Sequence, residues 1–140
     1  MSQLSSDTIH ASCIAIDGRA VLLAGRSGVG KSDLTLRLID RGATLVSDDY
    51  TLVRRRDGRL IASAPLNIAG KIEVRGVGIV EMAYLEEAEV ALLIDLEAPV
   101  ERLPSPETRQ IAGVTLPVAA LAPLEASAAI KVELLLKALP

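Results

Sequence analysis

A glycine-rich segment at residues 25–32 constrains this chain more than any other feature, because its letters GRSGVGKS match the phosphate-binding P-loop pattern. The apolar run at residues 19–24 before it predicts a buried strand, and the apolar residues after it, over residues 33–40, recur at helical spacing. Strand, loop and helix therefore occur in the order that a P-loop requires. The alternative, a plain glycine-rich turn, would not need these flanking elements. We therefore expect the chain to bind a nucleoside triphosphate and to move its terminal phosphoryl group.

The residues of this loop have separate predicted tasks. We expect Gly25, Gly28 and Gly30 to adopt positive φ and to turn backbone N–H groups toward phosphate oxygens, at the positive end of the following helix. Lys31 should reach the β- and γ-phosphates, and the hydroxyl of Ser32 should bind the magnesium ion that bridges them. The predicted nucleotide-binding residues are Gly25, Arg26, Ser27, Gly28, Val29, Gly30, Lys31 and Ser32.

The composition is that of a compact enzyme domain. The 140 residues are 50% hydrophobic, which suits a single domain over residues 1–140 with one core. No apolar stretch reaches the roughly 18 residues that a membrane-spanning helix needs. Residues 1–7 lack the pattern of a signal peptide, so we expect a cytoplasmic protein with no membrane partner. Cys13 is the only cysteine and has apolar neighbours, which favours buried packing over a nucleophile and excludes a thiolate metal site.

The charge pattern argues against nucleic acid as a partner. The formal net charge is −3 with both signs mixed, and the chain has only 2 tyrosines on which a base could stack. The one basic run is Arg54, Arg55 and Arg56, directly before Asp57 and Gly58. We interpret this run as the solvated part of a hairpin over residues 50–64.

Hydrophobic periodicity and turn residues predict the other elements. The predicted strands are residues 8–16, 19–24, 44–47 and 89–96. A helix is predicted at residues 31–41, with Gly42 as its C-terminal cap, and a polar-to-apolar segment at residues 67–80. Prolines interrupt the region after the last strand, until Pro123 begins a final helix. The residues expected to pack from this helix are Leu124, Ile130, Leu134, Leu135 and Leu139.

Two predicted strands end in aspartate, and either could supply a carboxylate beside the P-loop. Asp48 and Asp49 follow the strand at residues 44–47, which comes directly after the P-loop helix, so a crossover connection would bring them next to the loop. Asp95 ends an apolar strand that resembles a Walker B segment, but the sequence does not show where this strand lies in the sheet. Adjacent carboxylates repel each other, which tends to raise the pKa of one of them. A raised pKa suits a general base that accepts a proton from a hydroxyl. We favour Asp48 and Asp49, with helix capping or turn chemistry as the alternative for this pair.

These residues and a second segment carry a resemblance to a known family. Residues 25–32, Arg41 with Gly42, Asp48 with Asp49, and the letters EVRGVGIV at residues 73–80 resemble the catalytic domain of bacterial HPr kinase/phosphorylase, over about residues 10–102. The resemblance implies an α/β fold, a P-loop kinase domain of the HPr kinase / phosphoenolpyruvate carboxykinase type with a mixed β-sheet and flanking helices. It also implies that ATP and Mg2+ serve to phosphorylate a serine of HPr, the phosphocarrier of the phosphotransferase system, and that inorganic phosphate reverses the reaction.

The resemblance further implies roles for the aspartate pair and the metal ligands. Asp48 would be the general base toward the serine of HPr and the acid of the reverse reaction. Asp49 would support Asp48 and the metal. Glu73 would join Ser32 on magnesium, which is reasonable because magnesium prefers oxygen ligands.

Three more residues are implied to act in the site, and each has a structural alternative. Arg75 would stabilise charge on the transferred phosphoryl group, and strand alternation would place it on the same side as Glu73. A cross-sheet ion pair is the alternative for these two residues. His10 would lie near the phosphates and Arg102 would assist transfer, but local sequence alone favours an ordinary histidine and a surface arginine.

The sequence leaves three hypotheses about function. The chain starts near the catalytic domain of the family, ends at Pro140, and has no Gly-Arg-Asn triplet in residues 121–126, where the family has one. It is therefore predicted to be a short-form HPr kinase/phosphorylase, without the N-terminal domain and with a homo-oligomer left open. The alternatives are a P-loop small-molecule kinase and a regulatory module that binds ATP and a signalling protein without catalysis.

Overall fold

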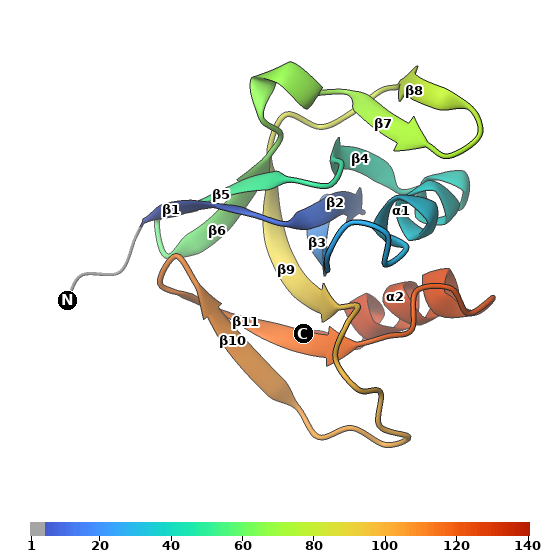
Figure 1. Cartoon of the computed structure of the whole chain (residues 1–140). Coiled ribbons are helices and arrows are strands. Elements are labelled where there is room, and N and C mark those ends of the chain that lie inside the picture. Colours follow the sequence, from blue (N-terminus) through green and yellow to red (C-terminus); the bar gives the residue numbers. More distant parts are fainter. Residues whose placement is uncertain (1–4) are drawn as a thin grey trace.

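The computed structural model describes residues 5–140 as a mixed β-sheet with two α-helices (Figure 1). The strands are β1 Ser6–Ile9, β2 Ala11–Ile16, β3 Arg19–Ala24, β4 Thr44–Ser47, β5 Thr51–Arg56, β6 Arg59–Ser63, β7 Lys71–Val74, β8 Gly78–Glu81, β9 Ala88–Asp95, β10 Glu107–Ile111 and β11 Val114–Ala120. The helices are α1 Lys31–Asp40 and α2 Ala128–Lys137, and a 3-10 turn covers Leu66–Ile68. Nine strands form the main sheet, in the order β1-β5-β6-β9-β3-β2-β4 with β11 on β9 and β10 on β11, while β7 and β8 pair separately. The predicted α/β fold with a mixed sheet is confirmed.

The parallel strands bring their carboxyl ends to one edge of the sheet. β9 pairs in parallel with both β3 and β11. β2 runs antiparallel between β3 and β4, so β4 has the direction of β3 although the two are not neighbours. Ligands of open α/β sheets bind outside the carboxyl ends of such strands. The segments that follow β3, β4, β9 and β11 are therefore the first places to look for a site.

Two apolar layers cover the faces of the sheet. On the helix side, Val21 and Leu23 of β3 join Leu34 of α1 and Val132 of α2 in one buried cluster. Leu22, between them in sequence, belongs to the cluster on the opposite face, as strand alternation requires. Figure 1 shows both helices on the same side of the sheet, so α1 is fixed between the sheet and the solvent by its apolar face.

Most local predictions for the first half of the chain are confirmed. β3, β4 and the β5–β6 hairpin form where predicted, and the hairpin turns at Asp57 and Gly58, both with the positive φ of a type I′ turn. Gly42 has a φ of 110° just beyond the end of α1, which is the conformation expected of a C-terminal glycine. Cys13 is buried, and burial raises the pKa of its thiol, in agreement with a packing role.

One prediction about strands is wrong, and one hairpin was not predicted. The expected strand at residues 8–16 is two strands, β1 and β2, separated at His10. The proline-interrupted region contains an ordered hairpin, β10–β11, whose turn has Ala112 at φ 49° and Gly113 at φ 81°. Alanine is not typical of such a turn, so nothing in the sequence indicated it. Pro117 is tolerated inside β11 because pairing with β9 starts only at Val118.

The prediction for the final helix is wrong in the position of its start and in three of the five residues expected to pack. α2 begins at Ala128 and not at Pro123, and the segment between them is a turn. The buried residues are Ala128, Ala129, Val132 and Leu136, while Leu124, Ile130 and Leu134 are exposed and Leu135 and Leu139 are partly buried. Within residues 5–140, neither helix has the length and apolar character of a membrane span.

Two leucines of α2 test this burial directly. Leu136 is 1% exposed and Leu134 is 60% exposed, so Leu136→Ala leaves a cavity and Leu134→Ala does not. We expect Leu136→Ala to lower the free energy of unfolding by about 3 kcal/mol, and Leu134→Ala to change it by less than about 0.5 kcal/mol. Urea denaturation of both variants measures the difference. Equal losses would mean that α2 packs with a different face.

Candidate functional site

The P-loop connects β3 to α1 at the carboxyl edge of the sheet (Figure 1). Gly28 has a φ of 87° and Gly30 a φ of 115°, so two of the three glycines adopt the predicted positive φ. Gly25 does not, and that part of the prediction is wrong. A Cβ atom on Gly25 would lie 2.8 Å from Cγ1 of Val29, which shows that this position needs glycine for space.

The backbone of the loop is open to an anion. Within the part of the chain that the structure describes, the N–H groups of Ser27, Gly28 and Gly30 donate no hydrogen bond. No side chain caps the start of α1, so the first turn of this helix keeps its unpaired N–H groups as well. Unpaired N–H groups and the positive end of a helix dipole together form a phosphate-binding surface.

Lys31 bends back over this loop. Its side chain is buried, and Nζ donates a hydrogen bond of 2.6 Å to the carbonyl of Gly25. The same Nζ lies 3.0 Å from Oδ1 of Asp49. A buried ammonium needs such partners. Lys31 therefore places a fixed positive charge between the start of the P-loop and the aspartate pair.

Asp48 receives hydrogen bonds from three different elements. Its Oδ1 accepts from the Ser32 hydroxyl at 2.7 Å and from the Ser12 hydroxyl at 3.2 Å. Its Oδ2 accepts from the backbone N–H of Glu73 at 3.0 Å. Asp48 is only 7% exposed, and these donors compensate the burial of its charge. As expected from the crossover connection, the carboxylate that follows β4 lies next to the P-loop, where it contacts Ser32.

Asp49 faces a different set of partners. Its backbone has a φ of 66°, and its Oδ1 lies 3.0 Å from both Nζ of Lys31 and Nε2 of His10. His10 Nε2 is also 3.3 Å from the Ser27 hydroxyl, and its ring stacks on Tyr50 at 4.8 Å. The two carboxylates thus share no polar side-chain partner, and His10 is placed beside the P-loop.

The other predicted residues are less closely assembled. Glu73 lies near the end of β7 and is exposed, and its backbone N–H donates a hydrogen bond to Asp48. Arg75 lies in the turn after β7 and not on the strand, so the prediction that it follows Glu73 by strand alternation is wrong. Arg102 is exposed in the segment between β9 and β10. Within residues 5–140, the side chains of Arg75 and Arg102 form no hydrogen bond or ion pair.

A small pocket of about 330 Å³ adjoins the first half of the P-loop, and its polar side chains connect β9 and β10 to the loop. Glu97 accepts hydrogen bonds from the Arg26 backbone N–H at 2.6 Å and from Arg26 Nε at 2.7 Å. Asp95, at the end of β9, accepts from the N–H groups of Glu97 and Ala98 and lies 3.1 Å from Arg109. Burial raises the pKa of Asp95, but these three donors outweigh it and hold the pKa below its usual value. Asp95 is therefore engaged in fixing the turn after β9.

Sequence reasoning missed several residues of this region. Ser12, Tyr50, Glu97 and Arg109 were not expected near the loop. Serine in a strand or arginine in a proline-rich segment gives no local signal for a site. Only the pairing of β2 with β4 and of β11 with β9 brings them there.

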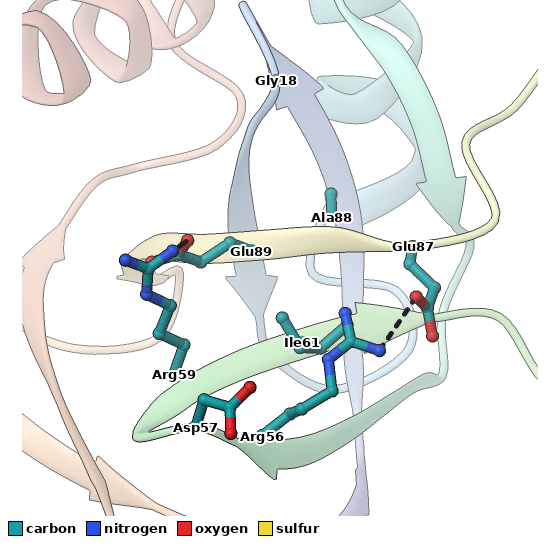
Figure 2. Close-up of a pocket in the computed structure, with 8 residues that line it drawn as sticks. All are labelled: Gly18, Arg56, Asp57, Arg59, Ile61, Glu87, Ala88 and Glu89. Atoms are coloured by element: carbon teal, nitrogen blue, oxygen red, sulfur yellow. Dashed lines mark hydrogen bonds and ion pairs between the residues drawn. The ribbon is translucent and has the colours of Figure 1, made fainter.

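A larger pocket of about 690 Å³ lies at the other end of the sheet, beside the β2–β3 and β5–β6 turns (Figure 2). Its arginines are paired with glutamates: Arg56 lies 3.2 Å from Glu87, and Arg59 lies 3.3 Å from Glu89. The hydrogen bond from Arg56 holds the pKa of Glu87 below its usual value. Because positive and negative charges alternate here, this pocket offers no surface for a polyphosphate.

The donor set near Ser32 fits magnesium. Ser32 and Asp48 offer a hydroxyl and a carboxylate in contact, and the Glu73 backbone on Asp48 brings a second carboxylate residue to the same place. No group of three or more histidine, cysteine or carboxylate side chains in residues 5–140 forms a complete metal cage. Magnesium commonly binds one or two carboxylates and completes its shell with phosphate oxygens and water. The residues therefore suit a cation that arrives with a nucleotide.

Comparisons with known proteins agree on one family. The family model described as HPr Serine kinase C-terminal domain matches residues 2–132. HPr kinase/phosphorylase of Clostridium botulinum is 38% identical over 96 residues, which cover 64% of this chain and 32% of the relative. That of Geobacillus thermodenitrificans is 41% identical over 105 residues, or 69% of this chain and 34% of the relative. The chain thus spans about a third of the length of these curated relatives.

One solved structure matches nearly the whole chain. The HPr(Ser) kinase/phosphatase structure from Coxiella burnetii superposes with a TM-score of 0.82 at 31% sequence identity. The match covers 94% of this chain and 94% of that chain. The likeness therefore extends over nearly the whole of this chain.

The charge of Asp95 should contribute to stability in a pH-dependent way. Because its folded-state pKa is lowered, this contribution is present above the unfolded pKa and is lost as the pH falls through the folded pKa. We expect Asp95→Asn to reduce the free energy of unfolding by about 1 kcal/mol at pH 7, and this deficit to shrink as the pH falls below the usual aspartate pKa toward the lowered folded-state pKa. Urea denaturation across pH 2–7 measures this, with Asp40→Asn as the exposed control. A deficit that does not shrink as the pH falls from 7 to 2 would contradict this expectation.

Proposed function

We propose, from the premise that this chain belongs to the HPr serine kinase C-terminal domain family, that it transfers the γ-phosphoryl group of ATP to a serine of the phosphocarrier protein HPr. The observation that carries the proposal is the contact of Ser32 and Lys31, at the end of the P-loop, with two aspartates that follow β4. Phosphoryl transfer depends on positioning and on electrostatic stabilisation. A phosphate loop with a lysine, a hydroxyl and carboxylates supplies the groups that this chemistry uses.

ATP would bind along the P-loop. The unpaired N–H groups of Gly28 and Gly30 and the start of α1 suit the α- and β-phosphates, and Lys31 suits the β- and γ-phosphates. Residues 25–32 would all contribute through the backbone of the loop. Lys31 would exchange its contact with Asp49 for phosphate oxygens, which keeps its buried charge compensated.

The residues that would hold magnesium are Ser32 and Glu73, with Asp49 in support. When bound, the ion would neutralise charge on the phosphate oxygens. Ser32 donates its proton to Oδ1 of Asp48, so the lone pairs of the Ser32 oxygen stay available for the ion while this hydrogen bond is kept. Ser12 and the Glu73 N–H would still hold the carboxylate in place.

Asp48 would act as the general base. It would accept the proton of the HPr serine hydroxyl as this oxygen attacks the γ-phosphorus and the bond to the β-phosphate oxygen breaks, which leaves ADP. In the phosphorolysis of phosphoserine, an oxygen of inorganic phosphate would attack the phosphorus, the bond from phosphorus to the serine oxygen would break, and pyrophosphate would form. Asp48 would then return the proton to the serine oxygen.

Arginine and histidine would assist from the rim of the site. Arg75 and Arg102 are exposed cations with no partner in residues 5–140, so either could turn toward the transferred group, and His10 lies within reach of the loop at Ser27. We place the reaction in the cytoplasm. A homo-oligomer is compatible with the same proposal.

Intact-mass spectrometry of HPr tests the proposed reaction. With this protein, ATP and magnesium, HPr should gain one phosphate group, and a chase with inorganic phosphate should remove it. Asp48→Asn should lower the rate of HPr phosphorylation by about a thousandfold or more while ATP still binds. Lys31→Ala should lose both ATP binding and phosphoryl transfer. ATP binding without transfer by the parent protein would support the regulatory module. Phosphorylation of a metabolite in the absence of HPr would support the small-molecule kinase.

Ser12 provides a second test, because it is fully buried and joins the aspartate pair. Its hydroxyl donates to Oδ1 of Asp48 and accepts from the backbone N–H of Asp49 at 2.9 Å. We expect Ser12→Ala to lower kcat of transfer by about tenfold and to leave KM for ATP within about twofold, since the carboxylate loses a fixed orientation. Ser63→Ala, outside the site, is the control. An equal effect on kcat and on ATP affinity would indicate general disruption of the loop.

A further inference from the structure

We infer that Leu124, which lies beside the buried Pro123, forms an apolar platform for the nucleobase, and that Arg37 holds this platform against the P-loop. The inference rests on the proposed function, because it assumes that a nucleoside triphosphate occupies the loop. It concerns the nucleoside part of the substrate, which the phosphate-binding residues do not contact. Its support comes from three features: contact with Gly30, fixation to α1, and the direction in which the phosphates must run.

Pro123 and Leu124 lie directly on the last glycine of the loop. A Cβ atom on Gly30 would be 3.0 Å from Cδ2 of Leu124 and 3.3 Å from Cγ of Pro123. Leu124 is nevertheless 73% exposed, so only one side of it contacts the protein. The other side presents apolar surface next to the start of α1. A large apolar side chain that is exposed beside a phosphate loop is suited to cover the flat face of a base.

Arg37 fixes this segment to the P-loop helix. Its guanidinium donates to the carbonyl of Glu125 at 3.0 Å and also to the carbonyl of Pro123, and its Nε lies 3.1 Å from Oδ2 of Asp33. One turn later, Arg41 pairs with Glu133 of α2 at 2.7 Å. The platform therefore keeps a constant position relative to Ser32 and the phosphates. Such preorganisation reduces the entropic cost of binding.

The geometry of Lys31 gives the direction of the nucleotide. Its Nζ, which suits the β- and γ-phosphates, lies at Gly25 and Asp49, so the γ-phosphate end belongs on that side of the loop. The N–H groups at the start of α1 suit the α-phosphate end. The nucleoside must then leave the loop past Gly30, where Leu124 and Pro123 lie.

The same contacts predict weak discrimination between bases. The carbonyls of Pro123 and Glu125 already accept from Arg37. The exposed side chain of Leu124 has no hydrogen-bonding group, so it contacts the face of a base and does not read its edge. We therefore expect GTP to bind within about fivefold of ATP, because strong selectivity needs paired polar groups.

Equilibrium binding of two probes tests the platform. We would measure the Kd values of ATP and of inorganic tripolyphosphate, both with magnesium, for the parent protein, Leu124→Ala and the matched control Leu134→Ala. Leu124→Ala should weaken ATP binding about fivefold and leave tripolyphosphate binding unchanged, because only ATP has a base to contact. Leu134→Ala should change neither. Leu124→Met should restore most of the ATP affinity.

The outcomes separate this inference from the proposed function. If Leu124→Ala weakens both probes equally, or weakens neither, the platform is overturned while the phosphate site remains. ATP binding more than fiftyfold tighter than GTP binding would also overturn an apolar platform without base readout. If the parent protein binds neither probe, the proposed function fails and the platform fails with it.

Discussion

The carboxylate of Asp48 is the point at which the site is assembled. It connects Ser12 of β2, Ser32 of α1 and the backbone of Glu73 in β7, three elements that are distant in sequence. Each donor compensates part of the cost of burying the charge, so the carboxylate and its donors stabilise one another. Removal of Asp48 would leave the hydroxyls of Ser12 and Ser32 and the N–H of Glu73 without their acceptor. The position of the β7–β8 hairpin beside α1 therefore depends on the same group that the proposed reaction uses.

Sheet topology makes this assembly feasible. β4 is separated from β3 by β2, and Asp48 still reaches the end of the P-loop because β4 and β3 have the same direction. β2 also contributes Ser12, whose hydroxyl contacts both Asp48 and the backbone of Asp49. The interposed strand is thus part of the site. A directly adjacent β4 would leave no place for this buried hydroxyl.

Features with local chemical causes could be predicted from the sequence. Glycines, lysine and serine at fixed spacing identified the P-loop, and Asp57 with Gly58 identified a hairpin. Features that depend on distant packing could not. Gly25 is required by the space that Val29 takes, Ala112 adopts a positive φ without a turn residue, and Ser12 joins the site only through pairing of β2 with β4. The buried face of α2 was mistaken because apolar residues lie on several sides of this helix, and only packing against the sheet selects Ala128, Ala129, Val132 and Leu136.

Helix α1 contacts the groups that would bind the two ends of the proposed substrate, and so fixes the distance between them. Its first residues, Lys31 and Ser32, contact the aspartates at the γ-phosphate end. Arg37, less than two turns later, holds the chain at Pro123 over Gly30. A helix is stiff over this distance, so the separation between the acidic pair and the apolar platform is nearly constant. Binding energy gained from the nucleoside would therefore help to align the γ-phosphate with Asp48, which is the way in which remote contacts of a substrate contribute to catalysis.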